Sequence, residues 1–120
     1  MVEAVQIAKK IMAKIEELET MRQELKVKGQ KKAEAIADYE KQLAKILIRL
    51  RNHDIFTLDG NTIHDPPVSI MEKVAKGLCW REALDKDVAE TRYKSLVKEI
   101  DVVLAQMNGL QSINRYLDNA

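Results

Sequence analysis

The chain has 120 residues, with 20 Lys and Arg against 19 Asp and Glu, so its formal net charge is +1. This balance excludes a whole-molecule electrostatic preference for nucleic acid or for an anionic membrane surface. Charged residues make up 32% and aromatic residues 4%, with only 4 Gly and 2 Pro. This composition is typical of long exposed helices and unlike that of a β-sandwich. We expect one all-α domain, residues 1–120.

The single cysteine, Cys79, cannot form an intrachain disulfide, so nothing indicates an oxidising compartment. The N-terminal stretch MVEAVQIAKKIMAKIEELE is too charged for a signal peptide or a membrane span. We therefore expect a cytoplasmic location, in the producing or infected cell, and no association with a membrane.

The first 50 residues carry a heptad pattern. Apolar residues or Tyr fill eleven of fourteen positions taken at alternating spacings of four and three, which predicts a helix over 2–51. The exceptions are Arg22, Gly29 and Lys32, and Gly costs about 1 kcal/mol relative to Ala inside a helix. An unchanged heptad phase on both sides of Gly29 favours one continuous helix, with a break there as the alternative. The predicted seam is Ala4, Ala8, Ile11, Ile15, Leu18, Arg22, Leu25, Gly29, Lys32, Ile36, Tyr39, Leu43, Ile46 and Leu50.

Residues 53–78 have a different pattern and are named here the head. Two short β-forming runs, IFTL (55–58) and TI (62–63), flank Asp59-Gly60-Asn61, which indicates a β-hairpin or turn. Asp65-Pro66-Pro67 then interrupts regular structure. The spacing of Ser69 and Glu72 predicts a capping box at the start of a short helix over about 69–78, with Gly77 as a stop signal.

The last helix, predicted over 79–118, has an unbroken seam from Ala89 to Leu110 that can continue to Leu117 through Asn108-Gly109. The tail after Gly109 is either a continuation or a short separate helix. Two narrow stripes of this kind favour a long antiparallel, coiled-coil-like helical hairpin with the head at its turn. Since the first helix is longer, some seam is left uncovered, and we expect a homo-oligomer. The seam positions are Ala89, Tyr93, Leu96, Ile100, Val103, Met107, Leu110, Asn114 and Leu117.

Lys41, Lys45 and Arg49 lie four residues apart on one helix face, with Arg51 close by. Such a stripe could hold phosphates of a nucleic acid, but a solvated face is the favoured interpretation because acidic residues are interspersed.

His53 and His64 bracket the hairpin beside several Asp residues, yet turn formation explains these residues better than a metal site does. We predict no metal and no cofactor. Cys79 is expected to be a small buried residue, since no base is placed to activate it. Trp80 is expected to anchor the head by packing, with base or partner stacking as the alternative.

No motif that carries chemistry is present: the chain has no phosphate-binding glycine loop, no paired Cys or His ligands and no nucleophile elbow. We therefore predict a protein that is not an enzyme. The stretch 106–115 is rich in neutral hydrogen-bonding side chains, which can recognise a ligand or fix helix register.

Two segments, DGNTIHDPPVSIMEKVAKGLCWREAL (59–84) and QMNGLQSINRYLD (106–118), resemble a family of small proteins from phages and prophages of Gram-positive bacteria. The resemblance covers most of residues 39–118, and its motifs carry no known chemistry. One departure is His53-Asp54-Ile55, which stands where an Asn-Gly-type turn is expected before Phe56. The resemblance implies a phage accessory protein in the host bacterial cytoplasm, of a kind that commonly acts against host defence.

These observations support a homo-oligomeric counter-defence protein that sequesters a nucleotide signal or blocks a host defence protein. Alternatives are a replication or recombination accessory that binds single-stranded DNA, and a structural coiled-coil adaptor. For a nucleotide, we expect the head and the tail to form one pocket, which requires an antiparallel neighbouring subunit. The residues predicted to bind the ligand are Lys73, Lys76, Trp80, Arg81, Asn114, Arg115 and Tyr116.

Overall fold

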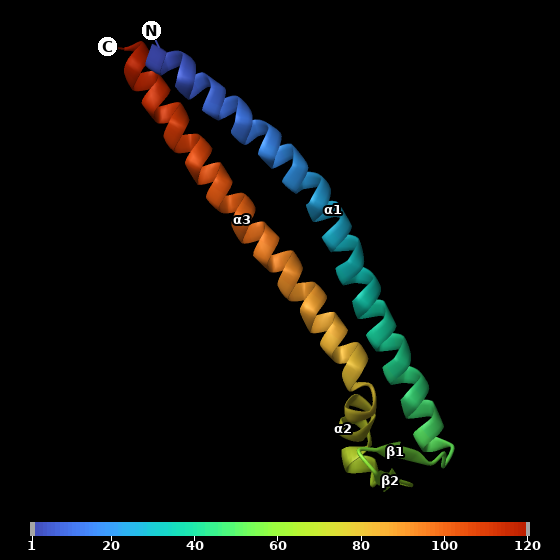
Figure 1. The fold of residues 1–120 in the computed structure, drawn as a ribbon. Coiled ribbons are helices and arrows are strands. Elements are labelled where there is room, and N and C mark those ends of the chain that lie inside the picture. Colours follow the sequence, from blue (N-terminus) through green and yellow to red (C-terminus); the bar gives the residue numbers. More distant parts are fainter. Residues whose placement is uncertain (1, 120) are drawn as a thin grey trace. The chain divides into compact units, whose positions relative to one another are not determined.

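The computed structural model describes residues 2–119, so the two ends of the predicted domain, residues 1 and 120, lie outside the described part. The elements follow one another as α1 (Val2–Arg51), β1 (Phe56–Leu58), β2 (Asn61–Ile63), α2 (Val68–Leu78) and α3 (Trp80–Asp118) (Figure 1). The predicted all-α class, with long first and last helices and a small hairpin between them, is confirmed. The chain divides into two compact units, residues 2–29 with 91–119 (unit 1) and residues 30–90 (unit 2), which are described separately.

Both long helices are continuous. Helix α1 passes through Gly29 and ends at Arg51, as the unchanged heptad phase predicts. Helix α3 passes through Gly109, so the tail is a continuation and not a separate helix. Among the described residues, no helix combines the length and the apolar content that a membrane crossing needs.

Unit 1 is an antiparallel pair of helical segments. The Lys14 ammonium donates a hydrogen bond to the Gln106 side-chain oxygen at 2.9 Å, and Gly29 lies against the ring of Tyr93. Since position 14 pairs with 106 and position 29 with 93, the two segments run in opposite directions. The core of the unit comprises Met21, Leu96 and Val103, with Leu18, Leu25 and Ile100 packed against it.

The predicted seam is confirmed throughout α3, where all nine positions are buried or half-buried. On the α1 segment of unit 1 it is wrong at Ala8, Ile15 and Arg22, which are exposed, whereas the other five positions, including Gly29, are half-buried. Met21 is buried where the pattern placed Arg22, and Lys14 is half-buried whereas Ile15 is 48% exposed. The alternating spacing of four and three selects one of two adjacent residues, such as Arg22 beside Met21. The antiparallel helix covers the other residue of the two. Arg22 instead pairs with Glu19 on the surface.

In unit 2 the end of α1, the hairpin, α2 and the start of α3 enclose a second core. Leu50, Ala75 and Cys79 are each no more than 1% exposed. Farther along the same unit, the Lys86 ammonium lies 4.6 Å from the centroid of the Tyr39 ring, so α1 and α3 run antiparallel here too.

The hairpin follows from the chemistry of its turn. Asp59 and Gly60 have φ of 49° and 79°, the positive values that a two-residue type I′ turn requires. The resulting register is Phe56↔Ile63, Thr57↔Thr62 and Leu58↔Asn61. An isolated two-stranded hairpin is only marginally stable, so its inward side chains must pack elsewhere. Leu58 does so against α2, 3.9 Å from where a Cβ on Gly77 would be.

Helix α2 matches the short helix predicted over about 69–78, but the capping box predicted at its start is wrong. The helix begins at Val68 with Pro67 as its N-cap, which forms no side-chain cap, so Ser69 lies inside the helix and no capping box forms. Pro67 instead accepts a bond from the Ile70 N–H through its carbonyl oxygen at 3.0 Å. Proline suits this position because it has no N–H to leave unpaired. Gly77 lies near the end of α2, where it was expected, and the helix ends one residue later.

Candidate functional site

The end of α1 is a Schellman motif with histidine in the position that glycine usually takes. His53 has φ of 65°, in the left-handed region. Its N–H bonds to the Leu50 carbonyl oxygen at 3.2 Å, and the Asp54 N–H bonds to the Arg49 carbonyl oxygen at 3.0 Å. These are the two bonds that define the motif. The departure seen in the sequence at His53-Asp54-Ile55 is therefore the stop of the helix.

Arg49 holds the chain that leaves this stop. Its Nε donates to the Asp54 carboxylate at 2.8 Å, and its guanidinium carbon lies 4.4 Å from the centroid of the Phe56 ring. The side chain therefore links the last turn of α1 to the first strand. A residue that sequence analysis placed on a phosphate-binding face serves here to position the hairpin.

Two imidazoles share one carboxylate beside this stop. His53 Nδ1 lies 2.6 Å from Asp65 Oδ1, and His64 Nε2 lies 3.3 Å from Asp65 Oδ2. Asp65 also has a positive φ, of 48°. Both partners of the short contact therefore hold a backbone conformation that few residues other than Gly adopt, although His and Asp tolerate it better than most.

The contact changes the ionisation of both groups. The hydrogen bond to Asp65, helped by its negative charge, raises the pKa of His53 above its ordinary value of 6.5. The hydrogen bond to His53 in turn lowers the pKa of Asp65 below 3.8. Between pH 3.8 and pH 6.5 the pair therefore holds a positive and a negative charge close together.

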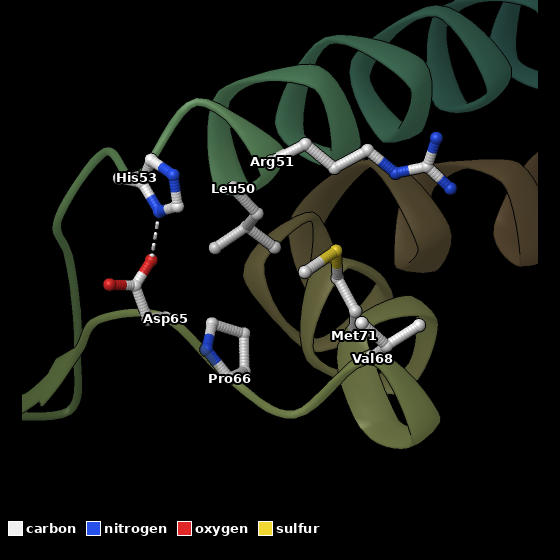
Figure 2. Close-up of a pocket in the computed structure, with 7 residues that line it drawn as sticks. All are labelled: Leu50, Arg51, His53, Asp65, Pro66, Val68 and Met71. Carbon is white, nitrogen blue, oxygen red and sulfur yellow. Dashed lines mark hydrogen bonds and ion pairs between the residues drawn. The ribbon is translucent and has the colours of Figure 1, made fainter.

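A pocket of about 440 Å³ opens next to this pair, and we name it the head pocket. Figure 2 shows His53 and Asp65 on one side of it, joined by their bond, with Leu50 between them and two side chains of α2. The Arg51 guanidinium extends along the helices, away from the pair. The lining residues are Leu50, Arg51, His53, Asp65, Pro66, Val68 and Met71.

Apolar walls with a few polar groups at the edge are the usual make-up of a pocket that receives an apolar group. The volume lies within the range of about 300–1,000 Å³ typical of ligand sites. Val68, on the α2 side, is 85% exposed and would lose that exposure if the pocket were filled. Within residues 2–119, no cluster of three or more His, Cys, Asp or Glu residues is suited to a metal ion.

Comparison of the chain with known protein families, with curated proteins and with solved structures gives no match.

The ligand-binding residues predicted in the head and directly after it all belong to unit 2. Lys76 forms an ion pair with Glu72 at 3.3 Å, one turn earlier on α2. The Arg81 guanidinium carbon lies 5.4 Å from the centroid of the Trp80 ring. Lys73 is exposed on α2. The structure thus brings Trp80 and Arg81 together on the surface, where stacking on a base or a partner side chain is open to them.

The predicted tail residues belong to unit 1, and they do not form one face. Asn114 is half-buried in the seam, whereas Arg115 is exposed and Tyr116 is 75% exposed. Consecutive residues on a helix point about 100° apart, so three in a row cannot converge on one ligand. Neither unit contains both the head group and the tail group, and the shared pocket stays a prediction.

The predicted phosphate-binding face retains two free cations. Lys41 and Lys45 are exposed on α1, four residues apart. Arg49 is bound to Asp54 and Arg51 lines the head pocket. The positive stripe that could track a nucleic-acid backbone is therefore short.

The expectation for Cys79 is confirmed, because its side chain is 1% exposed and burial raises the pKa of its thiol. The expectation that Trp80 anchors the head by packing is wrong, since the residue is 51% exposed. Trp80 opens α3 directly after the buried Cys79, and this places it on the outer side of the helix start.

From the sequence, His53, His64 and Asp65 were interpreted as turn residues and not as metal ligands, and Pro66 as part of a break in regular structure. Val68 and Met71 were not singled out. The sequence did contain a signal for the turn. His53 follows the last heptad position of the first helix and precedes Asp54, and His is one of the residues that can adopt the left-handed conformation at a helix C-terminus. No sequence pattern indicated the pocket. Its walls come from two helices and a loop, and the sequence does not specify the distances between them.

Proposed function

We propose that the chain is a non-enzymatic binding protein that receives an apolar side chain of a partner protein in the head pocket. The observation that carries this proposal is the pocket itself, with apolar walls from α1 and α2 and the His53–Asp65 pair at its edge. A protein side chain suits it better than a nucleotide does, because Arg51 is the only fixed cation among the lining residues.

The identity of the partner rests on the sequence. The resemblance of segments 59–84 and 106–118 to phage and prophage accessory proteins supports a host defence protein as the partner, in the cytoplasm of the host bacterium. Binding without chemistry would then act by blocking a surface of that protein.

A nucleotide signal is the second candidate, and the exposed Trp80–Arg81 pair favours it. An aromatic ring of this kind can stack on a base while the neighbouring guanidinium and Lys73 contact phosphate. This site lies outside the head pocket, so the two candidates depend on different residues.

The test selects linear peptides from a random library against the wild-type chain and measures their affinity by fluorescence anisotropy. Val68→Glu places a charge at the edge of the pocket, whereas Ile70→Glu makes the same change on α2 at a residue that does not line it. Val68→Glu removes the burial of one aliphatic side chain, so we expect the peptide affinity to fall by about tenfold or more. Ile70→Glu should leave the affinity unchanged.

A nucleotide mixture is measured in parallel by native mass spectrometry. Nucleotide binding that Trp80→Ala abolishes and Val68→Glu leaves intact would favour the second candidate. Peptides that lose affinity equally in both α2 variants would contradict the pocket as the binding site.

A further inference from the structure

A groove of about 510 Å³ lies between α1 and α3 within unit 1, and we name it the side groove. Clefts between packed helices are a common place for ligand sites, and the volume lies within their range of about 300–1,000 Å³. Two of its lining residues, Ala13 on α1 and Gly109 on α3, are small. A Cβ at position 109 would meet nothing within 4 Å, so the missing side chain leaves open space in the groove.

The apolar wall of the side groove comes from α3. Leu110 is half-buried in the seam, and Ile113 lines the groove although it is 49% exposed. From Gln106 to Ile113 this wall is about 10 Å long, at roughly 1.5 Å per residue. An alkyl chain of that length would cover both side chains and gain the free energy of apolar burial.

The polar side chains that line the side groove offer hydrogen-bond donors. The Lys14 ammonium donates to the Glu17 carboxylate at 3.3 Å and to the Gln106 side-chain oxygen at 2.9 Å, which leaves one of its three N–H groups. Because Gln106 uses its oxygen for this bond, its NH₂ group remains, and an NH₂ group only donates. Within residues 2–119, the Lys10 ammonium forms no ion pair.

The charge of the side groove is positive. Lys10 and Lys14 lie one helical turn apart on α1, so both ammonium groups can reach one ligand. Among the described residues, no Asp or Glu lines the groove, and Glu17 beside it is already bonded to Lys14. Charged donors beside an apolar wall are complementary to an anion that carries an alkyl chain.

We propose that the side groove binds the anion of a medium-chain fatty acid such as octanoate. The carboxylate accepts hydrogen bonds from Lys10, Lys14 and the Gln106 NH₂ group. The alkyl chain lies over Gly109 and extends to Ile113, where the wall ends. A nucleotide fits less well, because no aromatic side chain among the described residues lines the groove for a base to stack on.

This proposal does not depend on the head pocket. The side groove belongs to unit 1 and the head pocket to unit 2, and they have no lining residue in common. Either site can therefore fail its test without the other.

Isothermal titration calorimetry of the full chain with octanoate, below the concentration at which it forms micelles, tests the site. Octanoate should bind saturably. Octanol has the same chain length without the charge, and it should bind at least about fivefold more weakly. Lys10→Gln should weaken octanoate binding by roughly three- to tenfold and leave octanol binding unchanged, because it removes only a charged donor. Lys9→Gln is the matched control, since Lys9 is exposed on the same turn of α1 but does not line the groove.

Gly109→Leu tests the apolar part by filling it. This variant should weaken both octanoate and octanol by at least about tenfold, because the alkyl chain loses its place against the wall. Asn108→Leu adds the same side chain at the adjacent exposed residue, outside the groove, and should change neither affinity. Circular dichroism checks that the helices are kept, and Ala13→Leu, which fills the groove from α1, replaces Gly109→Leu if that variant unfolds.

Four results would each overturn the proposal. They are no saturable binding of octanoate, equal affinity for octanoate and octanol, the same loss in the K9Q and K10Q variants, and full affinity after the groove is filled.

Discussion

In unit 1 the buried side chains, Met21, Leu96 and Val103, come from two long helices alone. In unit 2 Leu50 comes from α1, Ala75 from α2 and Cys79 from the link between α2 and α3, with a hairpin packed beside them. The core of unit 1 is specified by an apolar pattern that recurs along both helices, so neighbouring turns offer nearly the same residues for packing. Unit 2 depends on single residues in special conformations, three of them with positive φ without being Gly. The comparison shows that the two cores are specified by different physical means, and it predicts different responses to mutation.

The largest expected effect is that of a cavity in the core of unit 2. Leu50→Ala should lower the free energy of unfolding by about 2–5 kcal/mol, because Leu50 is 1% exposed and enclosed by several elements. Leu96→Ala in unit 1 should fall near the lower end of that range, since helices packed along one seam can move together to fill the space. Urea unfolding followed by circular dichroism measures both, and equal losses would remove this difference between the units.

A smaller loss is expected from Gly60→Ala in the hairpin turn. Nothing lies within 4 Å of the added Cβ, but the φ of 79° costs about 1–2 kcal/mol for a residue with a side chain. Hydrogen exchange should show faster exchange of the amides of β1 and β2. Unchanged stability would mean that the turn can adopt another type at no cost.

In unit 1, replacing Gly by Ala should raise the stability of the chain instead of lowering it. Gly109→Ala adds a Cβ that meets nothing within 4 Å inside a continuous helix, so it should stabilise the chain by about 0.5–1 kcal/mol. Gly29→Ala should gain a similar amount, because its Cβ would lie 3.4 Å from the Tyr93 ring, an ordinary contact distance. Thermal unfolding distinguishes the two, and a loss at Gly29 alone would show that Tyr93 cannot adjust.

The smallest effect is expected from pH, because His53 and Asp65 are on the surface. The raised pKa of His53 makes its contribution complete below pH 6.5 and lost as the pH rises through the folded-state value. The lowered pKa of Asp65 makes its contribution complete above pH 3.8 and lost as the pH falls through its folded-state value. The pair should therefore stabilise unit 2 most between these two pH values.

An NMR titration of the His53 ring measures the shift directly. His53→Asn is the matched variant, since Asn also tolerates a positive φ but cannot become charged. We expect a small decrease in the melting temperature of the wild-type chain between pH 6 and pH 8, and this variant should not show it. A His53 pKa at or below 6.5 would contradict the contact.

The sequence predicted the fold well where one physical signal dominated. The alternation from Ala89 to Leu117 located the face of α3, and Asp59-Gly60 located the hairpin turn because few other residues accept its φ values. The seam of α1 was predicted less well, since Met21 and Arg22 both lie within reach of the partner and only packing decides between them.

The candidate site was largely out of reach of sequence analysis. The head pocket needs α2 to start at Val68 and the chain to turn at His53 and Asp65, two residues that are twelve positions apart in sequence and lie in contact at 2.6 Å. Trp80 was misplaced for a related reason. Its exposure follows from α3 beginning at that residue, a boundary that apolar spacing cannot determine.

The burial of Cys79 gives unit 2 a built-in chemical reporter. It is the single cysteine of the chain, so any thiol reagent that reacts does so at this residue. The thiolate is the reactive form, and burial both raises the pKa of this thiol and blocks access to it. The alkylation rate at constant pH therefore measures how often the second core opens, in the native chain and without any added label.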